Sequence, residues 1–590
     1  MTVSRITFRT SVSAVALTMA LGMGMPNKAY ATQCDFGDEL DNPAAGADQA
    51  TACGPDAVAI GNRAIAEGED TVAVGTDATV IDADGVDGNT GSSNSTAIGD
   101  AATVGIAADG VTQVDSPNST AIGGSASAVG ANATAVGANS FAASESTALG
   151  ESSAATAIQA TAIGVFSDAT GVGSTAIGYD ANATAAGAFA AGLGSDATGA
   201  NSIAIGNNAN ATAANAIAQG NGAQATGPNA LAIGTGAISE GSVAIGALAH
   251  AALGNTAVGD GAQAFVAPEA SAFGQNANAS GLGSVAFGSD SLANNTGAIA
   301  IGGDSSQSGV AATASGIGAI AIGGDVNNAT GALASGDFGV AIGDSTTATG
   351  ARSSAFGVQA DAQGTDSTAV GEGSIAGGGG SVAVGSDTRA RGGSSVAIGN
   401  NAQTGSAPGI GAPFATAVGA NTQAAATGSV AIGTDSGGNG AVASAPNQFV
   451  LGTANHTYTA PGITSDLSRE RQSGPLELVT TDANGNLASD NGQIFRELGK
   501  QGAGIAIATA MENPDLVGNE TFGLSANVGF FEGNSAIAVG LMGVLGRDFM
   551  GGGERWALSG GVGVSLNENN FGSQNTDRAV AGRAGVQVTW

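Results

Sequence analysis

A phrase that recurs with a 14-residue period constrains the fold of this chain more than any other feature. In "NSIAIGNNANATAANAIAQGNGAQATGPNALAIGTG" (residues 201–236), a short run ends at Gly206, Gly220 and Gly234, which keep a constant 14-residue spacing. Two longer series keep this spacing apart from one step of 13: Gly123, Gly137, Gly150, Gly164, Gly178, Gly192, Gly206, Gly220, Gly234, and then Gly343, Gly357, Gly371, Gly385, Gly399. A fixed period indicates stacked structural repeats that bury their apolar faces against one another.

Each repeat has the pattern of two short strands. In "SVAIGNNAQTG" (395–405), Val396 and Ile398 alternate with small residues, as in a half-buried strand, and Gly399 permits a sharp turn. A second alternation of small residues follows in each unit, as at Ala223 and Ala225. Two strands within one 14-residue repeat predict one coil of a narrow parallel solenoid, and we expect alanine, valine and isoleucine to fill its thin interior.

The predicted solenoid, residues 57–452, is long. The span from Gly61 to Gly433 corresponds to about 26 coils, somewhat fewer once insertions are allowed for. With strands roughly 4.8 Å apart, the stack is on the order of 100–120 Å long. The spacing widens after Gly75, Gly99, Gly302, Gly323 and Gly399. We interpret these gaps as loops inserted into single coils, expect them on one face, and predict that they carry binding specificity.

Composition and charge exclude several partners. Glycine provides 100 of 590 residues, but without the three-residue period of collagen. The formal net charge is −33, which argues against nucleic acid, anionic lipid and heparin-like partners.

The N-terminus predicts export. Arg5 and Arg9 precede an apolar run from Val12 to Met25, and the small residues Ala29 and Ala31 follow. This pattern is typical of a secretory signal peptide, residues 1–31. Its removal takes away three basic residues and no acidic ones, so the charge of the remaining chain is −33 − 3 = −36.

The two cysteines, Cys34 and Cys53, lie in a predicted N-terminal cap, residues 32–56. Exported proteins meet an oxidising environment, so we predict a disulfide between them. A lipid-modified Cys34 and free thiols are the alternatives, although "ATQC" is a poor context for lipidation.

The C-terminal region changes to long, strict alternation. Four segments of about ten residues carry apolar side chains on one face and polar or small ones on the other: 521–530, 535–546, 555–566 and 578–590. This pattern is typical of outer-membrane barrel strands. Four strands cannot close a barrel, so we expect the chain to oligomerise or to join another barrel.

Together, the signal peptide, the 14-residue "S-x-A-I-G" repeat and the four C-terminal strands ending at Trp590 resemble a trimeric autotransporter adhesin of the YadA-like family. The stretch "GNSAIAVGLMGVLG" (533–546) is similar to that family's second anchor strand. The resemblance covers the repeats and about the last hundred residues. The chain departs from the family in the connector, residues 453–490. Family members usually have a long coiled-coil stalk there, whereas this chain has room only for a compact neck.

The resemblance implies a homotrimer whose fold is mainly all-β. Its head is a left-handed parallel β-roll, followed by the neck, a pore helix at 491–512 and four anchor strands within 513–590. Three chains then form a 12-stranded transmembrane barrel, with Ala536, Ala538 and Gly540 facing the helices in the pore. The implied partners are the outer membrane, its barrel-assembly machinery, and a ligand on a host cell or in the extracellular matrix.

Candidate chemistry is sparse. His250 and His456 have no partners for nucleophilic or metal catalysis nearby in the sequence, and we expect ordinary surface or packing roles for both. "DADGVDGN" (82–89) and "DANGN" (482–486) resemble calcium loops but lack the later glutamate, which favours turns instead. The glycine run 377–380 lacks the lysine and hydroxyl residue of a phosphate loop. We expect no enzyme and no cofactor.

Two functions remain open. The first is an adhesin for host cells, matrix or surfaces that also mediates autoaggregation, with its C-terminal barrel anchoring and translocating the passenger. The alternative is a structural spacer or biofilm scaffold without a dedicated receptor.

Overall fold

A computed structural model describes residues 32–33, 50–53, 56–82, 91–106, 113–304, 311–325, 330–406, 410–473, 476–566 and 578–590. The predicted signal peptide and Cys34 lie outside these residues. The chain divides into two compact units, Met1–His456 and Thr457–Trp590, which we call the head and the anchor unit.

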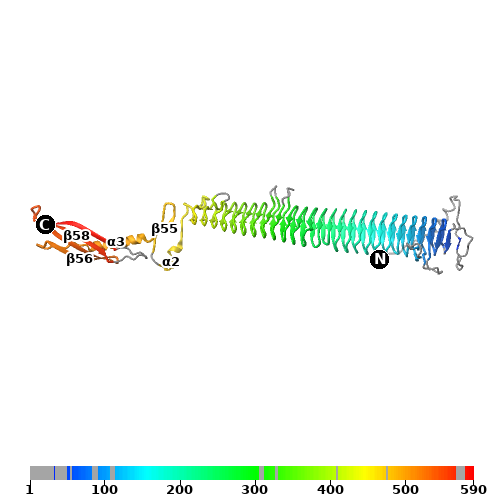
Figure 1. Ribbon diagram of the computed structural model, residues 1–590, viewed down its shortest axis with the longest axis horizontal. Helices are drawn as coiled ribbons and strands as arrows, with labels where there is room; N and C mark the ends of the chain where they lie inside the picture. Colours follow the sequence, from blue (N-terminus) through cyan, green and yellow to red (C-terminus); the bar gives the residue numbers. More distant parts are fainter. Residues whose placement is uncertain are drawn as a thin grey trace, which may run out of the picture. The chain divides into compact units, whose positions relative to one another are not determined.

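The head is a parallel solenoid of short strands (Figure 1). Strands of three residues, the odd-numbered β3 (Val58–Ile60) to β53 (Phe449–Leu451), form one stack of 26 strands. A second stack of 27 strands contains β1 (Thr32–Gln33) and the even-numbered strands from β2 (Thr51–Cys53) to β52 (Val442–Ala443). The predicted two-strand coil is confirmed.

One coil illustrates the register. Strand β21 (Ile203–Ile205) pairs in parallel with β23 (Ile217–Gln219), and Ala204 lies opposite Ala218. In the other stack, β22 (Asn210–Ala211) pairs with β24 (Gln224–Ala225). Each strand therefore bonds to its equivalent one coil later, and every interior strand has neighbours on both sides.

Alanine fills the interior of the head. Ala204, Ala209, Ala211 and Ala216 of one coil are all fully buried, and the pattern repeats along the solenoid. At several positions serine replaces alanine and its hydroxyl donates a hydrogen bond to a carbonyl of the same turn, as Ser395 Oγ does to Gly392 O at 2.7 Å. The core is therefore mainly a column of methyl and hydroxymethyl groups.

Our expectation that valine and isoleucine also fill the interior is wrong for most coils, and Val80 and Val104 are the exceptions among the described head residues. In β47 (Val396–Ile398), Ala397 is buried, whereas Val396 is half-buried and Ile398 is 40% exposed. A regular 14-residue coil brings its two strands close together, so that alanine is the usual side chain between them. The branched side chains of the three-residue strands point outward, whereas Val80 and Val104 of the two-residue strands are fully buried.

The insertions leave the register intact. Strand β5 (Val72–Val74) pairs with β7 (Thr96–Ile98), and β35 (Ile299–Ile301) pairs with β37 (Ile320–Ile322), although each pair is more than one repeat apart in sequence. The extra residues therefore fall within single coils, as predicted.

The described residues that border the insertions show that the predicted placement on one face is wrong. Three insertions are preceded by residues 81–82, 105–106 and 405–406, which follow a two-residue strand, and the other two by residues 302–304 and 323–325, which follow a three-residue strand. The inserted residues themselves lie outside the described residues. Both turns of a coil are solvent-facing edges, so either accepts extra residues without disturbing the alanine core.

The anchor unit has different elements. It begins with a 3₁₀ turn, η1 (Pro461–Thr464), and helix α2 (Asp466–Arg471), and a small hairpin follows, β54 (Val479–Thr481) and β55 (Leu487–Ser489). Helix α3 (Gln493–Ala510) precedes an antiparallel sheet in the order β56 (Phe522–Phe531), β57 (Asn534–Arg547), β58 (Arg555–Ser565) and β59 (Val580–Thr589). The four predicted strands are confirmed to within a few residues at each end.

Candidate interaction surfaces

The repeat glycines make closely packed turns. Gly206, Gly220 and Gly234 have φ values of 131°, 139° and 131°. A Cβ on Gly206 would lie 2.5 Å from the carbonyl oxygen of Gly220, and one on Gly220 would lie 2.4 Å from that of Gly234. A Cβ added to Gly385 or Gly399 would likewise lie 2.7 Å or 2.6 Å from the nearest backbone atom of the next coil. Both backbone conformation and stacking therefore require glycine here.

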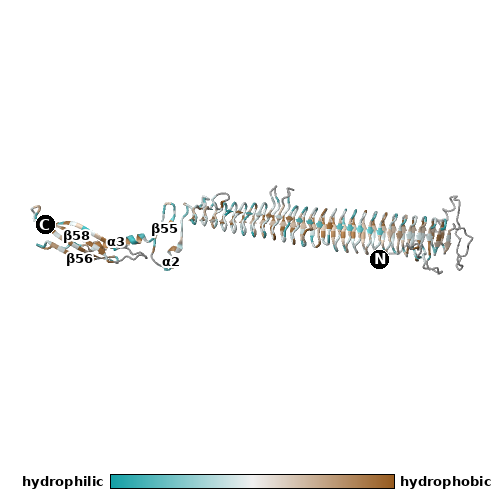
Figure 2. Cartoon of the chain, in the orientation of Figure 1, coloured by the Kyte–Doolittle hydropathy of each residue, from teal (hydrophilic) through white to brown (hydrophobic). Residues whose placement is uncertain are grey.

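An apolar surface follows the stack of three-residue strands. We call this surface the stripe, and it consists of the first and third residues of the odd-numbered strands from β3 to β53. In most coils these are threonine, valine, isoleucine or leucine, and third residues such as Ile205, Ile301 and Ile398 are 37–40% exposed. Brown strand segments recur along the head in Figure 2. A largely apolar surface of this length is typical of a protein–protein interface.

The turns carry ladders of polar side chains. The residue before the buried alanine of each turn often has a left-handed backbone, which Asn and Asp tolerate, as at Asn208 and Asn215. Side chains one coil apart bond there, as from Asn215 Nδ2 to Asn229 Oδ1 at 3.2 Å. Arg352 Nε lies 2.6 Å from Asp366 Oδ1, and this guanidinium lowers the pKa of the Asp366 carboxyl.

His250 lies on the outward face of a two-residue strand. Its ring stacks on Phe265 at a centroid distance of 4.5 Å, and its Nε2 is 3.6 Å from Glu240 Oε1. The surrounding coils depart from the regular spacing, and Leu253 and Val266 expose more than 60% of their surface. His250 therefore packs on the surface, as predicted.

His456 belongs to a hydrogen-bonded closure at the end of the head. Its Nδ1 accepts a hydrogen bond from Thr453 N at 2.9 Å. Asp435 accepts hydrogen bonds from Thr453 Oγ1 and Asn455 Nδ2 at 3.1 and 2.7 Å. Hydrogen bonds, chiefly from the Asn439 side chain, lower the pKa of Asp435 strongly. This network ties the loop 434–440 to the last residues of the head.

The other candidate motifs form turns where they are described. Asp482 accepts hydrogen bonds from Asn484 N and Asn486 N, both at 2.9 Å, within the loop of the β54–β55 hairpin. Gly380, in the glycine run, has φ of 65° at an ordinary coil turn. Segment 82–89 lies outside the described residues except for Asp82. In the described ranges, no group of three or more His, Cys, Asp or Glu residues could hold a metal ion.

Cys53 ends strand β2 and takes part in a disulfide bond. Cys34, its predicted partner, is outside the described residues, so the pairing of these two cysteines stays a prediction.

Helix α3 packs closely on one face of the anchor sheet. Ala536 and Ala538 are at most 3% exposed on this face, and Gly540 is beneath the segment after the helix, with Glu512 O 2.7 Å from the position of an added Cβ. At Gly529 an added Cβ would lie 2.2 Å from Ala506 O, and at Gly563 2.4 Å from Ile507 Cγ2. The helix approaches so closely because the strands beneath it carry glycine and alanine.

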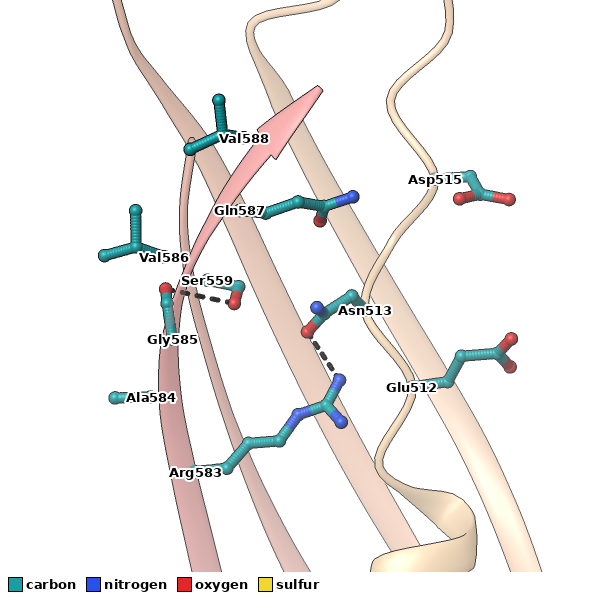
Figure 3. A pocket seen from close by; sticks show the side chains of 10 residues that line it. All are labelled: Glu512, Asn513, Asp515, Ser559, Arg583, Ala584, Gly585, Val586, Gln587 and Val588. Atoms are coloured by element: carbon teal, nitrogen blue, oxygen red, sulfur yellow. Dashed lines mark hydrogen bonds between the residues drawn. The ribbon is translucent and has the colours of Figure 1, made fainter. Parts of the chain in front are cut away.

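The same face holds a cavity of about 690 Å³ beside β58 and β59 (Figure 3). Arg583 reaches across it and donates a hydrogen bond to Asn513 Oδ1 at 2.5 Å, while Ser559 Oγ donates to Gly585 O at 3.2 Å. The carboxylates of Glu512 and Asp515 lie on the segment opposite β59. The helix-bearing face is therefore polar where the helix does not cover it.

The opposite face of the sheet is apolar and exposed. Ile537, Val539 and Leu541 are 38–47% exposed, and Trp590, the last residue, is 82% exposed. Within the described strands, β56 pairs only with β57, and β59 only with β58. The sheet thus has two free edges, which usually require a partner. No helix among the described residues is both long and apolar enough to cross a bilayer.

Sequence reasoning missed two features of the head. One is the outward direction of the branched side chains in the stripe. The other is the set of polar ladders along the turns, for which a signal was present: Arg63 and Asp77, like Arg352 and Asp366, have the 14-residue spacing of the repeat. Opposite charges at the repeat spacing predict contact between neighbouring coils.

Comparison with known protein families agrees with this geometry. The model of the YadA head domain repeat (2 copies) matches residues 48–78, 116–140, 143–167, 169–195, 197–218, 211–237, 266–291, 279–305, 334–360, 348–374, 362–388, 376–402 and 413–436. A search of curated proteins finds no match to the chain. The matched segments extend through the solenoid, and the free-edged sheet fits one chain's share of a barrel anchor. The chain belongs to the YadA-like family of trimeric autotransporter adhesins, a membership that implies a homotrimer.

Proposed function

We propose that the protein is an outer-membrane adhesin whose head attaches cells to host tissue, extracellular matrix or other surfaces and to one another. The observation that carries this proposal is the anchor sheet, with four strands, an apolar outer face, a helix on the inner face and two free edges. Family membership supports a surface-exposed location on the outer membrane.

In the proposed assembly, three copies contribute four strands each to a 12-stranded barrel. Strand β59 of one copy then pairs with β56 of the next, which satisfies every free backbone group at the sheet edges. The exposed side chains of Ile537, Val539 and Leu541 face lipid, and three α3 helices occupy the pore. Ala536, Ala538 and Gly540 leave the space that these helices need. The same pore is the route by which the head is exported.

The head presents its surface in multiple copies. Neighbouring coils repeat similar side chains at strand spacing, and a trimer triples each of them, so weak contacts add up to strong attachment. The inserted loops break this uniformity and are the proposed sites of specificity. The described residues that border them lie on both edges of the solenoid, so we expect two separate sets of contacts with ligands.

A spacer or biofilm scaffold is the second candidate, and the regularity of the head favours it. Six threonines at 14-residue intervals, Thr156, Thr170, Thr184, Thr198, Thr212 and Thr226, are exposed beside the two-residue strands without any irregular feature among them. Such a uniform surface suits a rod.

The anchor is tested by fractionation. Outer-membrane fractions analysed on gels with and without heating are expected to contain a heat-resistant trimer that requires residues 513–590. A monomer in the soluble fraction contradicts the anchor assignment.

The adhesin and the scaffold are separated by deleting the inserted loops while keeping the 14-residue units. Removal of 83–90, 107–112, 305–310, 326–329 and 407–409 is expected to abolish binding to cells or matrix proteins and to leave the trimer intact. Unchanged binding contradicts loop specificity and favours the scaffold.

A further inference from the structure

The side chains of the stripe compensate one another in volume. Alanine or serine occupies a first or third position in only three of the 26 three-residue strands, and each time phenylalanine occupies the other position. These pairs lie in β19 (Phe189–Ala191), β31 (Ser271–Phe273) and β41 (Ser354–Phe356). Phenylalanine is the first residue in one strand and the third in the other two. What these strands share is therefore the combined side-chain volume of the two positions, and not which position holds the large residue.

Volume compensation indicates a covered surface. On a surface that faces water, solvent fills whatever space a small side chain leaves, and nothing fixes the total volume. Across a packed interface the space is limited, and both cavities and overpacking destabilise. In the single chain the rings are not covered, since Phe356 is 38% exposed and Phe189 is half-buried.

Two phenylalanines of the stripe have no small residue in their own strand. Phe449 stands with Leu451 in β53, the last strand of the stack, and Phe287 stands with Val285. The Phe287 ring lies 6.0 Å from that of Phe273 in the preceding coil. Ser271 of that coil leaves space next to this pair. The aromatic volume here is shared between two coils.

A three-fold arrangement fixes which positions meet. In every coil, the first residue of the strand follows one turn and the third residue precedes the other turn. The stripe therefore has a first-residue side and a third-residue side. When three parallel copies turn their stripes toward a common axis, the first-residue side of one copy meets the third-residue side of the next.

We propose that in the homotrimer each first-position side chain of the stripe packs against the third-position side chain of the same coil in the neighbouring copy. Phe189 then lies over Ala191 of the neighbouring copy, and Phe273 and Phe356 lie over its Ser271 and Ser354. This inference rests on the homotrimer and adds its register, because compensation within one coil works only when the three copies lie level. A shift by one coil would place Phe189 against Ile205 or Ile177, where no small residue makes room.

The register is tested by cross-linking the full-length protein in outer membranes. The double variant Phe189→Cys/Ala191→Cys is oxidised, boiled in detergent and separated without reducing agent. We expect a covalent trimer, because each of the three interfaces brings one introduced cysteine of each kind together. The two single variants and the unmodified protein, which keep Cys34 and Cys53, are expected to run as monomers.

The matched control moves one cysteine by one coil. Phe189→Cys/Ile205→Cys is expected not to cross-link, and a covalent trimer from this pair would show a shifted register and overturn the proposal. The double variant Phe189→Cys/Ala191→Cys could also stay monomeric after oxidation while its unheated sample still contains the heat-resistant trimer. That result would overturn the proposed contact but not the homotrimer. Absence of that trimer from the unmodified protein overturns the homotrimer itself.

A swap of side chains gives a second measurement that does not depend on disulfide chemistry. Phe189→Ala leaves a cavity and Ala191→Phe overpacks, so each is expected to lower the temperature at which the trimer dissociates on gels. The double variant Phe189→Ala/Ala191→Phe is expected to recover most of this loss. Losses that simply add in the double variant contradict the proposed contact.

Discussion

The head and the anchor unit both place small residues inside and large apolar residues outside, but they reach this arrangement differently. In the head, alanines from two parallel stacks fill an interior that belongs to one chain. In the anchor, Ala536, Ala538 and the strand glycines face a helix, and the sheet edges stay free. The head completes its own core, whereas the two edge strands of the anchor sheet, β56 and β59, each pair on one side only among the described strands.

This difference explains how each unit tolerates change. A coil of the head bonds mainly to its two neighbours, so an extra loop at a turn alters only that coil. In the proposed barrel the anchor has no equivalent freedom, because the same few strands hold the helix and pair with other copies at both edges. Assembly of the trimer is therefore expected to be most sensitive to the anchor.

The largest effect is expected from a side chain placed beneath helix α3. Gly529→Val puts carbon atoms where the backbone of Ala506 and Ala510 lies, at 2.2 and 2.6 Å from an added Cβ. We expect loss of the heat-resistant trimer from outer membranes, since the helix can no longer seat. The matched control is Gly543→Ala in the neighbouring strand, where an added Cβ meets nothing within 4 Å. A normal trimer with Gly529→Val would show that helix packing does not limit assembly.

The next largest effect is expected at a repeat turn of the head. Gly220→Ala combines an unfavourable backbone at φ 139° with an oxygen 2.4 Å from the new Cβ. It should lower the opening free energy of the surrounding coils by about 2–4 kcal/mol. Gly222→Ala, at φ 65° with nothing within 4 Å, should cost only about 1 kcal/mol. Hydrogen exchange over residues 203–234 measures both, and equal losses would argue against coil-to-coil contact as the cause.

A smaller effect is expected from enlarging the interior of the head. Ala204→Val adds two methyl groups to the alanine core and should reduce the opening free energy by about 1–3 kcal/mol. Thr212→Val, on the exposed face of the same coil, should stay within about 0.5 kcal/mol. The same exchange measurement compares them. If Ala204→Val stabilised the coil, the interior would be wider than the alanine packing implies.

The smallest effect is a dependence on pH at the end of the head. Hydrogen bonds, first of all from the Asn439 side chain, lower the folded pKa of Asp435. Its contribution to stability is therefore complete above the unfolded pKa of about 3.9 and is lost as the pH falls below that value toward the folded pKa.

Pepsin, which cleaves at acidic pH, provides the measurement. Cleavage near Tyr458 should accelerate from pH 4 to pH 2 more in the natural protein than in Asp435→Asn, which lacks the titrating carboxyl. Identical acceleration in both proteins would show that Asp435 does not secure this closure.

Much of the fold is predictable from the sequence because the repeat spacing counts the coils directly. The spacing of Gly206, Gly220 and Gly234 determines the register of strands such as β21 and β23, and the alternation in 535–546 identifies β57. The direction of Val396 and Ile398 is not predictable in this way. Two-residue alternation distinguishes the two faces of a strand but does not identify which face is buried. The narrow gap between the two stacks determines that the face with alanine is the buried one.

The candidate surfaces are less predictable than the fold. The distance between Gly75 and Gly99 gives the size of an insertion but not which of the two turns holds it. The sequence of a single strand likewise does not indicate what packs against the stripe. The proposed contact is suggested only when Phe189 and Ala191 are compared with the same positions in the other coils. Such compensation reflects contacts between chains, which local periodicity does not record.

In the proposed trimer, the apolar stripe is covered by other copies while the opposite stack faces the surroundings at the cell surface. Labelling of intact cells with a membrane-impermeant thiol reagent distinguishes these two environments, with Ile233→Cys in the stripe compared with Thr212→Cys on the opposite stack. We predict rapid labelling at 212 and protection at 233 until heating dissociates the trimer. Equal labelling of both positions on intact cells would contradict a covered stripe.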